Sequence, residues 1–155
     1  MSERFTIVLG YDDSDCAHHA LERCADLARR LEGALVVVTN AYEFSFGYVP
    51  MGVADSPLLM SHEFDEHVDL VRSYAEERVA GAAQRLEELG VAAETRVAEG
   101  RPVDVLLDTA RERQAALIVV GSHGEGALAG ALLGSTALKL LHQSEVPVLV
   151  VPLRR

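Results

Sequence analysis

The stretch AALIVVG, residues 115–121, decides the fold that this sequence predicts. It is a continuous apolar run ending on glycine, which is typical of a parallel strand buried on both faces. Similar apolar runs lie at 5–11, 34–41 and 146–152. Residues 91–100 alternate between apolar and polar side chains, as in a strand at the edge of a sheet. Five strands are therefore expected.

Helical segments separate these strands. Each carries apolar residues at spacings of three and four, and together they cover about 17–31, 61–89, 102–113 and 135–143. The alternating order predicts one α/β domain over residues 1–155, with an open parallel sheet covered by helices on both faces. The segment 42–60 contains two prolines and two glycines and is longer than an ordinary connection, so a lid or flap is expected there.

Two polar turns indicate where a ligand would bind. The first strand ends in GYDDSD, residues 10–15, and the fourth ends in GSHGEG, residues 121–126. Ligands of open parallel sheets bind beyond the carboxyl ends of the strands, where the strand order reverses. We therefore expect the first and fourth strands to be neighbours at that point.

Composition and charge disfavour some classes of function for this chain. The formal net charge of −10 disfavours nucleic-acid binding, which depends on clustered Lys and Arg. No apolar run is long enough for a membrane span, and the amino terminus lacks a secretory signal, so no membrane association and a cytoplasmic location are expected. Cys16 and Cys24 lie about 12 Å apart along one helix, too far for a disulfide. His62 and His67 are poorly spaced for a metal site and are interpreted as solvated.

The glycines after residue 120 follow a fixed spacing. Gly121, Gly124 and Gly134, followed by Ser135, form the pattern G-x2-G-x9-G-[ST], which resembles the ATP-binding universal stress proteins. The stretches IVLGYDDS (7–14) and LLGSTALKLLHQSEVPVLVV (132–151) resemble the first strand and the closing helix and strand of the same family. The resemblance implies a Rossmann-like, adenine nucleotide alpha hydrolase-like sheet with strand order 3-2-1-4-5.

The segment 121–136 contains no lysine, yet phosphate binding is expected there. Consecutive main-chain amides in a glycine-rich loop form a concave nest that binds anions without side-chain charge. The helix that begins after Gly134 adds N–H groups and the positive end of its dipole. The resemblance implies ATP-binding residues at Gly10, Asp12, Asp13, Ser14, Ala41, Gly121, Ser122, His123, Gly124, Glu125, Gly126, Gly134, Ser135 and Thr136.

The expected cofactor is ATP or another adenine nucleotide, with Asp12 as the candidate ligand of an accompanying Mg²⁺. Glu125 departs from the family pattern, since a basic residue is common there and a carboxylate about 4 Å from a phosphate costs roughly 1 kcal/mol in water. Affinity is then weakened or made dependent on Mg²⁺. Ala116 and Thr136 are further departures that should not abolish binding.

Two structural alternatives are open. The DDSD turn is also what precedes many helices, with Ser14 as the N-cap, and for that turn alone this interpretation is favoured. Gly126, Gly130 and Gly134 could form a small-residue packing face on a helix. Each interior glycine would cost a helix in water about 1 kcal/mol, so a loop is favoured for 121–133.

Three functions are compatible with these residues. The leading one is a nucleotide-responsive regulator that binds ATP and forms a homodimer through the final strand, 146–152, as the resemblance suggests. The alternatives are a slow Mg²⁺-dependent ATPase or phosphotransferase using Asp12 or Asp13, and a nucleotide-free dimeric interaction module, for which Glu125 is the best argument. No nucleophilic triad can be assigned, and His123 is interpreted as a phosphate contact or an exposed side chain.

Overall fold

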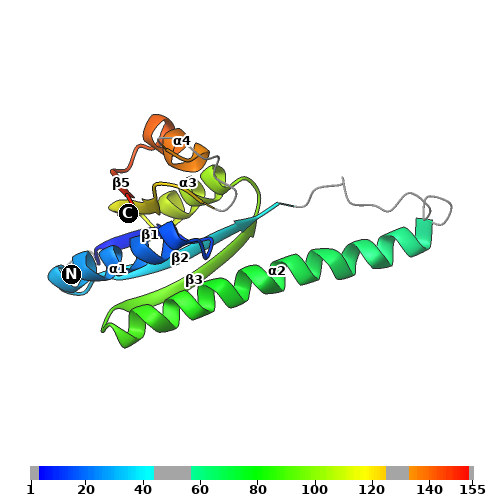
Figure 1. The fold of residues 1–155 in the computed structure, drawn as a ribbon, viewed down its shortest axis with the longest axis horizontal. Helices are drawn as coiled ribbons and strands as arrows, with labels where there is room; N and C mark the ends of the chain where they lie inside the picture. Colours follow the sequence, from blue (N-terminus) through cyan, green and yellow to red (C-terminus); the bar gives the residue numbers. More distant parts are fainter. Residues whose placement is uncertain (1–3, 44–56, 125–132, 154–155) are drawn as a thin grey trace.

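A computed structural model describes residues 4–43, 57–124 and 133–153, and of residues 57–64 the helical backbone alone. Its centre is one parallel sheet in the order β3-β2-β1-β4-β5 (Figure 1). The fold class and strand order expected from the sequence are confirmed. The strands are β1 (Thr6–Gly10), β2 (Leu35–Tyr42), β3 (Ala92–Glu99), β4 (Leu117–Gly121) and β5 (Val148–Val151).

The four expected helices are present; the fourth has the predicted ends, and the ends of the other three are shifted. They are α1 (Asp15–Arg30), α2 (Pro57–Glu88), α3 (Pro102–Glu112) and α4 (Ser135–Gln143). The second helix begins at Pro57, four residues before the predicted start, so the last four residues of the expected flap are helical. Proline suits a first helical position because its missing N–H would have no intrahelical acceptor there. Residues 44–56 of that flap lie outside the described part of the chain.

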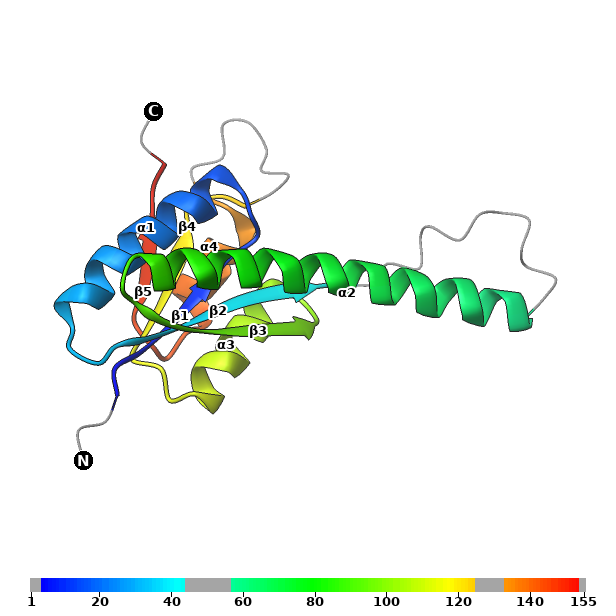
Figure 2. The ribbon, with the colours of Figure 1, turned by 90° about the horizontal axis from the view of Figure 1, so that it is seen from below.

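Helices cover both faces of the sheet, with α1 and α2 on one side and α3 and α4 on the other (Figures 1 and 2). Successive residues of β1 serve the two layers in turn, because side chains alternate along a strand. Ile7 and Leu9 pack into the α1 and α2 layer, whereas Val8 packs into the α3 and α4 layer, and all three are fully buried. This explains the unbroken apolar run: both faces of the strand are core.

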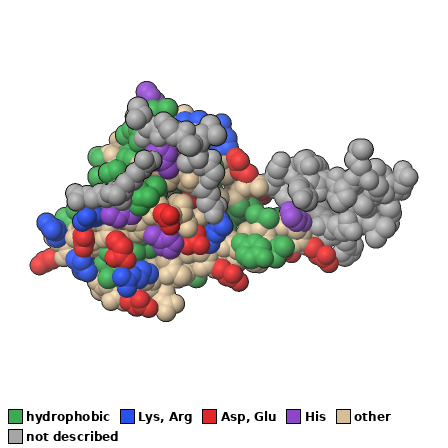
Figure 3. Space-filling view, in the orientation of Figure 1, with side chains coloured by type: hydrophobic (Ala, Val, Ile, Leu, Met, Phe, Trp, Pro, Cys, Tyr) green, Lys and Arg blue, Asp and Glu red, His purple; other side chains and the backbone are tan. Residues whose placement is uncertain are grey.

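The amino-terminal half of α2 projects beyond the sheet (Figures 1 and 2). Its described side chains begin to be buried only at Ala75. Before that point Leu70 and Tyr74 are about half exposed, and Figure 3 shows an apolar patch over this part of α2. Among the described residues, no helix, the long α2 included, is both long and apolar enough to cross a membrane.

The sheet order sets two polar turns side by side. Strands β1 and β4 pair in parallel, with Leu9 opposite Val119, so their carboxyl ends finish together. The chain leaves β1 toward β2 on one side, whereas β4 pairs with β5 on the other. The strand order therefore reverses between β1 and β4, as the sequence predicts.

Candidate functional site

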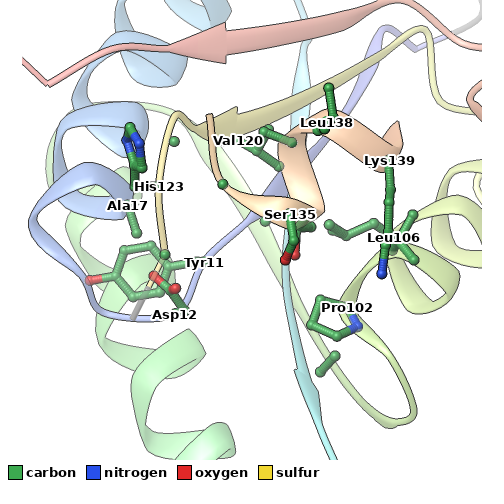
Figure 4. Close-up of a pocket in the computed structure, with 18 of the residues that line it drawn as sticks. Tyr11, Asp12, Ala17, Pro102, Leu106, Val120, His123, Ser135, Leu138 and Lys139 are labelled. Carbon is green, nitrogen blue, oxygen red and sulfur yellow. The ribbon is translucent and has the colours of Figure 1, made fainter. Parts of the chain in front are cut away.

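A cleft of about 850 Å³ opens at the carboxyl ends of the strands (Figure 4). Its walls come from the ends of β1, β2 and β4, the start of α3, and the first turns of α4. The volume lies within the range of about 300 to 1,000 Å³ typical of small-molecule sites. Its position is the one that parallel sheets use for ligands.

Two glycines at strand ends allow the walls to come together. A β-carbon added at Gly10 would lie 2.9 Å from Val120 Cγ1, and one added at Gly121 would lie 2.8 Å from Cys16 Cβ. The second clash also involves the main chain of Cys16, at 2.9 Å. Gly121 therefore lets α1 approach the end of β4, a packing role that the sequence pattern did not indicate. Both glycines still line the cleft.

The two ends of the glycine-rich segment close on each other. The Gly134 N–H donates to the Ser122 carbonyl oxygen at 2.7 Å. A β-carbon at Gly134 would meet His123 Cα and the same carbonyl oxygen at 3.2 Å, so a side chain there would require the two ends of this segment to separate by a few tenths of an ångström. The Ser122 hydroxyl in turn lies 3.0 Å from His123 Nδ1. The structure thus brings Ser122, His123, Gly124 and Gly134 to one wall of the cleft.

The start of α4 faces the cleft without a side-chain cap. Its N-cap is Gly134, which has no side-chain oxygen, and no side-chain hydrogen bond to this helix end is present in the described residues. The first amides of a helix have no intrahelical acceptor, and they carry its positive dipole end. Ser135 and Thr136, whose hydroxyls are further donors, line the cleft beside these amides (Figure 4).

Helix α1 differs at its own start. Its N-cap is Ser14, whose hydroxyl accepts the Ala17 N–H at 3.2 Å. The N-cap interpretation of the DDSD turn is confirmed. Ser14 does not line the described cleft. Because α1 supplies its own cap and α4 does not, α4 is the better candidate for binding an anion.

The two aspartates of this turn face different cavities. Asp12 lines the cleft (Figure 4), and its Oδ1 accepts the Ser14 N–H at 3.1 Å and the Ser14 hydroxyl at 2.6 Å. Asp13 adopts a left-handed backbone conformation, with φ of 66°, and lines a separate groove between α1 and α2. Only Asp12 is placed to contact a ligand in the cleft.

Asp13 belongs to a polar cluster on the groove side. Its Oδ1 accepts the Tyr11 hydroxyl at 3.0 Å and lies 3.0 Å from His18 Nε2. Burial, followed by the hydrogen bond to Asp13, raises the pKa of the Tyr11 hydroxyl well above its usual value. Tyr11 lines both cavities, and its main-chain carbonyl accepts the Asn40 amide from β2. Tyr11 therefore lies between the cleft and the groove and helps to separate the two cavities.

The lining of the cleft also contains residues that the motif did not indicate. Arg101 and Pro102 at the start of α3, Leu106 one turn later, and Lys139 on α4 all line the cleft. Ala41, which the resemblance did imply, lies near them at the end of β2. Lys139 follows Ser135 by four residues, and helical periodicity alone would have placed the two side chains on one face.

Some expected residues are not described. Glu125, Gly126 and Gly130 lie outside the described ranges, as does the side chain of His62. His67 is exposed on α2 and does not line the cleft. Over the described ranges, no group of three or more His, Cys, Asp or Glu side chains could hold a metal ion.

Known proteins resemble this chain over nearly its whole length. The model of the universal stress protein family matches residues 3–152. Universal stress protein YxiE of Bacillus subtilis is 31% identical over 153 residues, with 94% of this chain and 97% of that protein covered.

Solved structures share the fold of this chain. Universal stress protein UspA from Lactobacillus plantarum superposes with a TM-score of 0.78 at 20% identity, covering 97% of this chain and 99% of the other. A universal stress protein solved in complex with cAMP has a TM-score of 0.64 at 28% identity, covering 95% of both chains.

Proposed function

The chain belongs to the universal stress protein family, and on that premise we propose that it binds ATP or another adenine nucleotide in this cleft and acts as a nucleotide-responsive regulator. The observation that carries the proposal is the convergence of the uncapped start of α4 and the loop 122–124 at the carboxyl end of the sheet. A related protein solved with cAMP supports an adenine nucleotide as the ligand class.

The cleft offers different chemistry along its length. The amides of the first turn of α4 and the hydroxyls of Ser135 and Thr136 are donors suited to phosphate oxygens. Gly10 and Ala41, at the ends of β1 and β2, line the cleft together with the apolar side chains of Pro102 and Leu106, and a flat base would pack against this apolar lining. Asp12 lies beside Tyr11 after the end of β1 (Figure 4), where a ribose hydroxyl or a cation could be held.

Mg²⁺ fits this site through one carboxylate. Such ions are commonly held by one or two carboxylates together with substrate phosphates and water. Asp12 supplies one carboxylate, while Asp13 is turned into the other groove. Any Mg²⁺ would therefore depend on the nucleotide for most of its ligands, and it would offset part of the repulsion between a polyphosphate and a chain of net charge −10.

A slow ATPase is the enzymatic alternative. Asp12 is the observation in its favour, since a carboxylate in the cleft could hold Mg²⁺ or orient water. Turnover of labelled ATP by the wild type, with Asp12→Asn as the control, distinguishes an enzyme from a binding protein. Release of phosphate that is lost in the variant would favour the enzyme.

The exposed edge of β5 is the observation that supports a homodimer as the regulatory unit. It pairs with β4 alone in the described structure, and its Leu149 is 38% exposed. Leu138, Leu141 and Leu153, on α4 and after β5, are likewise exposed. A second copy of the chain, paired along this edge, would bury these side chains and satisfy the free strand edge. The cytoplasm is the proposed location of this dimer.

Calorimetric titration with ATP, ADP and AMP, with and without Mg²⁺, tests the proposed function. Two isosteric variants sharpen the result, because Asp12 and Asp13 are adjacent but face different cavities. We expect Asp12→Asn to weaken Mg-ATP binding about tenfold and Asp13→Asn to leave it unchanged. A wild-type protein that binds no adenine nucleotide at millimolar concentration would contradict the proposal.

A further inference from the structure

We propose that Lys139 is the cationic residue that recognises the ligand's phosphate in this cleft, a charged contact that the segment 121–136 lacks. This inference rests on the proposed function and assigns to it one further specificity-determining residue. Lys139 is the only lysine of the chain, and it lines the same cavity as the start of α4.

Helix geometry places the ammonium group near the phosphate region. Lys139 follows Ser135 by four residues, so both side chains lie on one face of α4, about 6 Å apart along the axis. Side chains in a helix lean toward its amino terminus, and lysine carries its charge on a long flexible stem. Figure 4 shows Ser135 and Lys139 extending from α4 to the same side, into the cleft. A phosphate held at the first turn of α4 is therefore within reach of Lys139.

The charges around the cleft favour an anionic partner for this lysine. Arg101, the other cation of the described lining, is bound to Asp104 through its Nε at 2.6 Å. Lys139 is exposed and has no ion pair or hydrogen bond within the described ranges. The protein as a whole has a net charge of −10, so the ammonium group of Lys139 is the feature of this cleft that attracts a phosphate.

The contact predicts a specific dependence on the ligand. A nucleoside has no phosphate, so its affinity should not depend on Lys139. Affinity for AMP should depend on it, and the dependence should weaken as salt concentration rises. An exposed ammonium and phosphate pair corresponds to about a fivefold effect on affinity at low salt.

Calorimetry on matched variants tests the contact. Lys139→Gln and Lys139→Arg are compared with Arg30→Gln, which removes one charge from an exposed position at the end of α1, outside the cleft lining. We expect Lys139→Gln to weaken AMP binding about fivefold and adenosine binding not at all, with Arg30→Gln and Lys139→Arg close to the wild type. Thermal unfolding checks that all variants are folded.

Chemical labelling gives a second measurement on the unmodified protein. Because Lys139 is the only lysine, an amine-acylating reagent used in limiting amount modifies Lys139 and the amino-terminal amine. Mass spectrometry of peptides distinguishes the two modified sites. Saturating AMP should slow acylation of Lys139 several-fold, whereas adenosine should not, and the amino-terminal amine serves as the internal reference.

The outcomes separate the two proposals. If the wild type binds AMP but Lys139→Gln behaves like Arg30→Gln, or loses adenosine affinity to the same extent as AMP affinity, the role of Lys139 is wrong and the nucleotide site stands. Unchanged acylation at saturating AMP has the same meaning. If the wild type binds no adenine nucleotide, the proposed function fails, and the role of Lys139 fails with it.

Discussion

The carboxylate of Asp12 occupies the space in which a side chain at Gly124 would begin, since a β-carbon added there would lie 2.5 Å from Asp12 Oδ2. The contact joins the turn after β1 to the loop after β4, two segments that are distant in sequence. It explains why glycine is needed at this position of the spacing pattern. A side chain at residue 124 and a carboxylate at residue 12 compete for the same space.

Gly124→Ala should therefore act through Asp12. We expect it to displace the carboxylate and weaken Mg-ATP binding about tenfold, the effect also expected of Asp12→Ala, while the fold persists because the obstacle is the end of a side chain. In the Asp12→Ala background the alanine at residue 124 should cost little more. Calorimetry on the four proteins of this double-mutant cycle measures the coupling, and additive effects would contradict the steric explanation.

Gly121→Ala should instead destabilise the fold. The added methyl group would meet the Cβ, carbonyl carbon and carbonyl oxygen of Cys16 at 2.8 to 2.9 Å, and a helix backbone cannot rotate away as a side chain can. Overpacking of this kind costs about 1 to 3 kcal/mol. Urea denaturation measures the free energy of unfolding. Gly81→Ala in α2 is the control, because nothing lies within 4 Å of the added carbon and stability should rise by up to about 1 kcal/mol.

Cys24 should be unreactive in the folded protein. Its side chain is fully buried, and burial raises the pKa of its thiol to about 12. At pH 8 a thiol reagent should modify it only after denaturation, since the thiolate is the reactive form.

The same pKa shift predicts a pH dependence of stability. The thiol ionises near pH 9 in the unfolded chain but near pH 12 in the folded one, so its contribution to stability is complete below about pH 9 and lost as the pH rises toward 12. Unfolding in urea across this range should give a steeper decline for the wild type than for Cys24→Ala. Parallel declines would show that the buried thiol makes no such contribution.

Assembly through β5 can be tested with one charged substitution. Leu149→Arg places a charge on the exposed side of the edge strand and should convert the dimer to a monomer in light scattering at micromolar concentration. Leu70→Arg is the matched control, since Leu70 is also exposed but lies on the projecting part of α2. A wild-type monomer, or a dimer unaffected by Leu149→Arg, would exclude this edge as the interface.

Local patterns predicted most of the fold. Apolar runs such as 115–121 and helical spacing elsewhere gave the element order, because periodicity reflects which faces of an element are buried. The ends of elements were less accurate. The second helix begins at Pro57 and not at residue 61, and β5 covers Val148–Val151 within the predicted 146–152. Such ends depend on local capping and pairing, which leave a weaker signal in sequence.

The candidate site was predicted in outline. The spacing of Gly121, Gly124 and Gly134 led to loops that border the cleft, since the chain order of an open parallel sheet brings the ends of β1 and β4 together. The resemblance could not separate Asp12 from Asp13, which are adjacent in the turn. Their opposite directions follow from one left-handed backbone angle at Asp13 and from its hydrogen bond to Tyr11.

By itself, the sequence determined the alternation of strands and helices, the position of the glycine-rich turn and the absence of lysine within it. Only the tertiary structure decided that Gly121 makes room for Cys16, that Asp12 faces the cleft, and that Lys139 reaches the same cavity from α4. The physical reason is that periodicity and turn propensity act between neighbours along the chain, whereas these contacts form between segments that meet only after the helices have packed on the sheet.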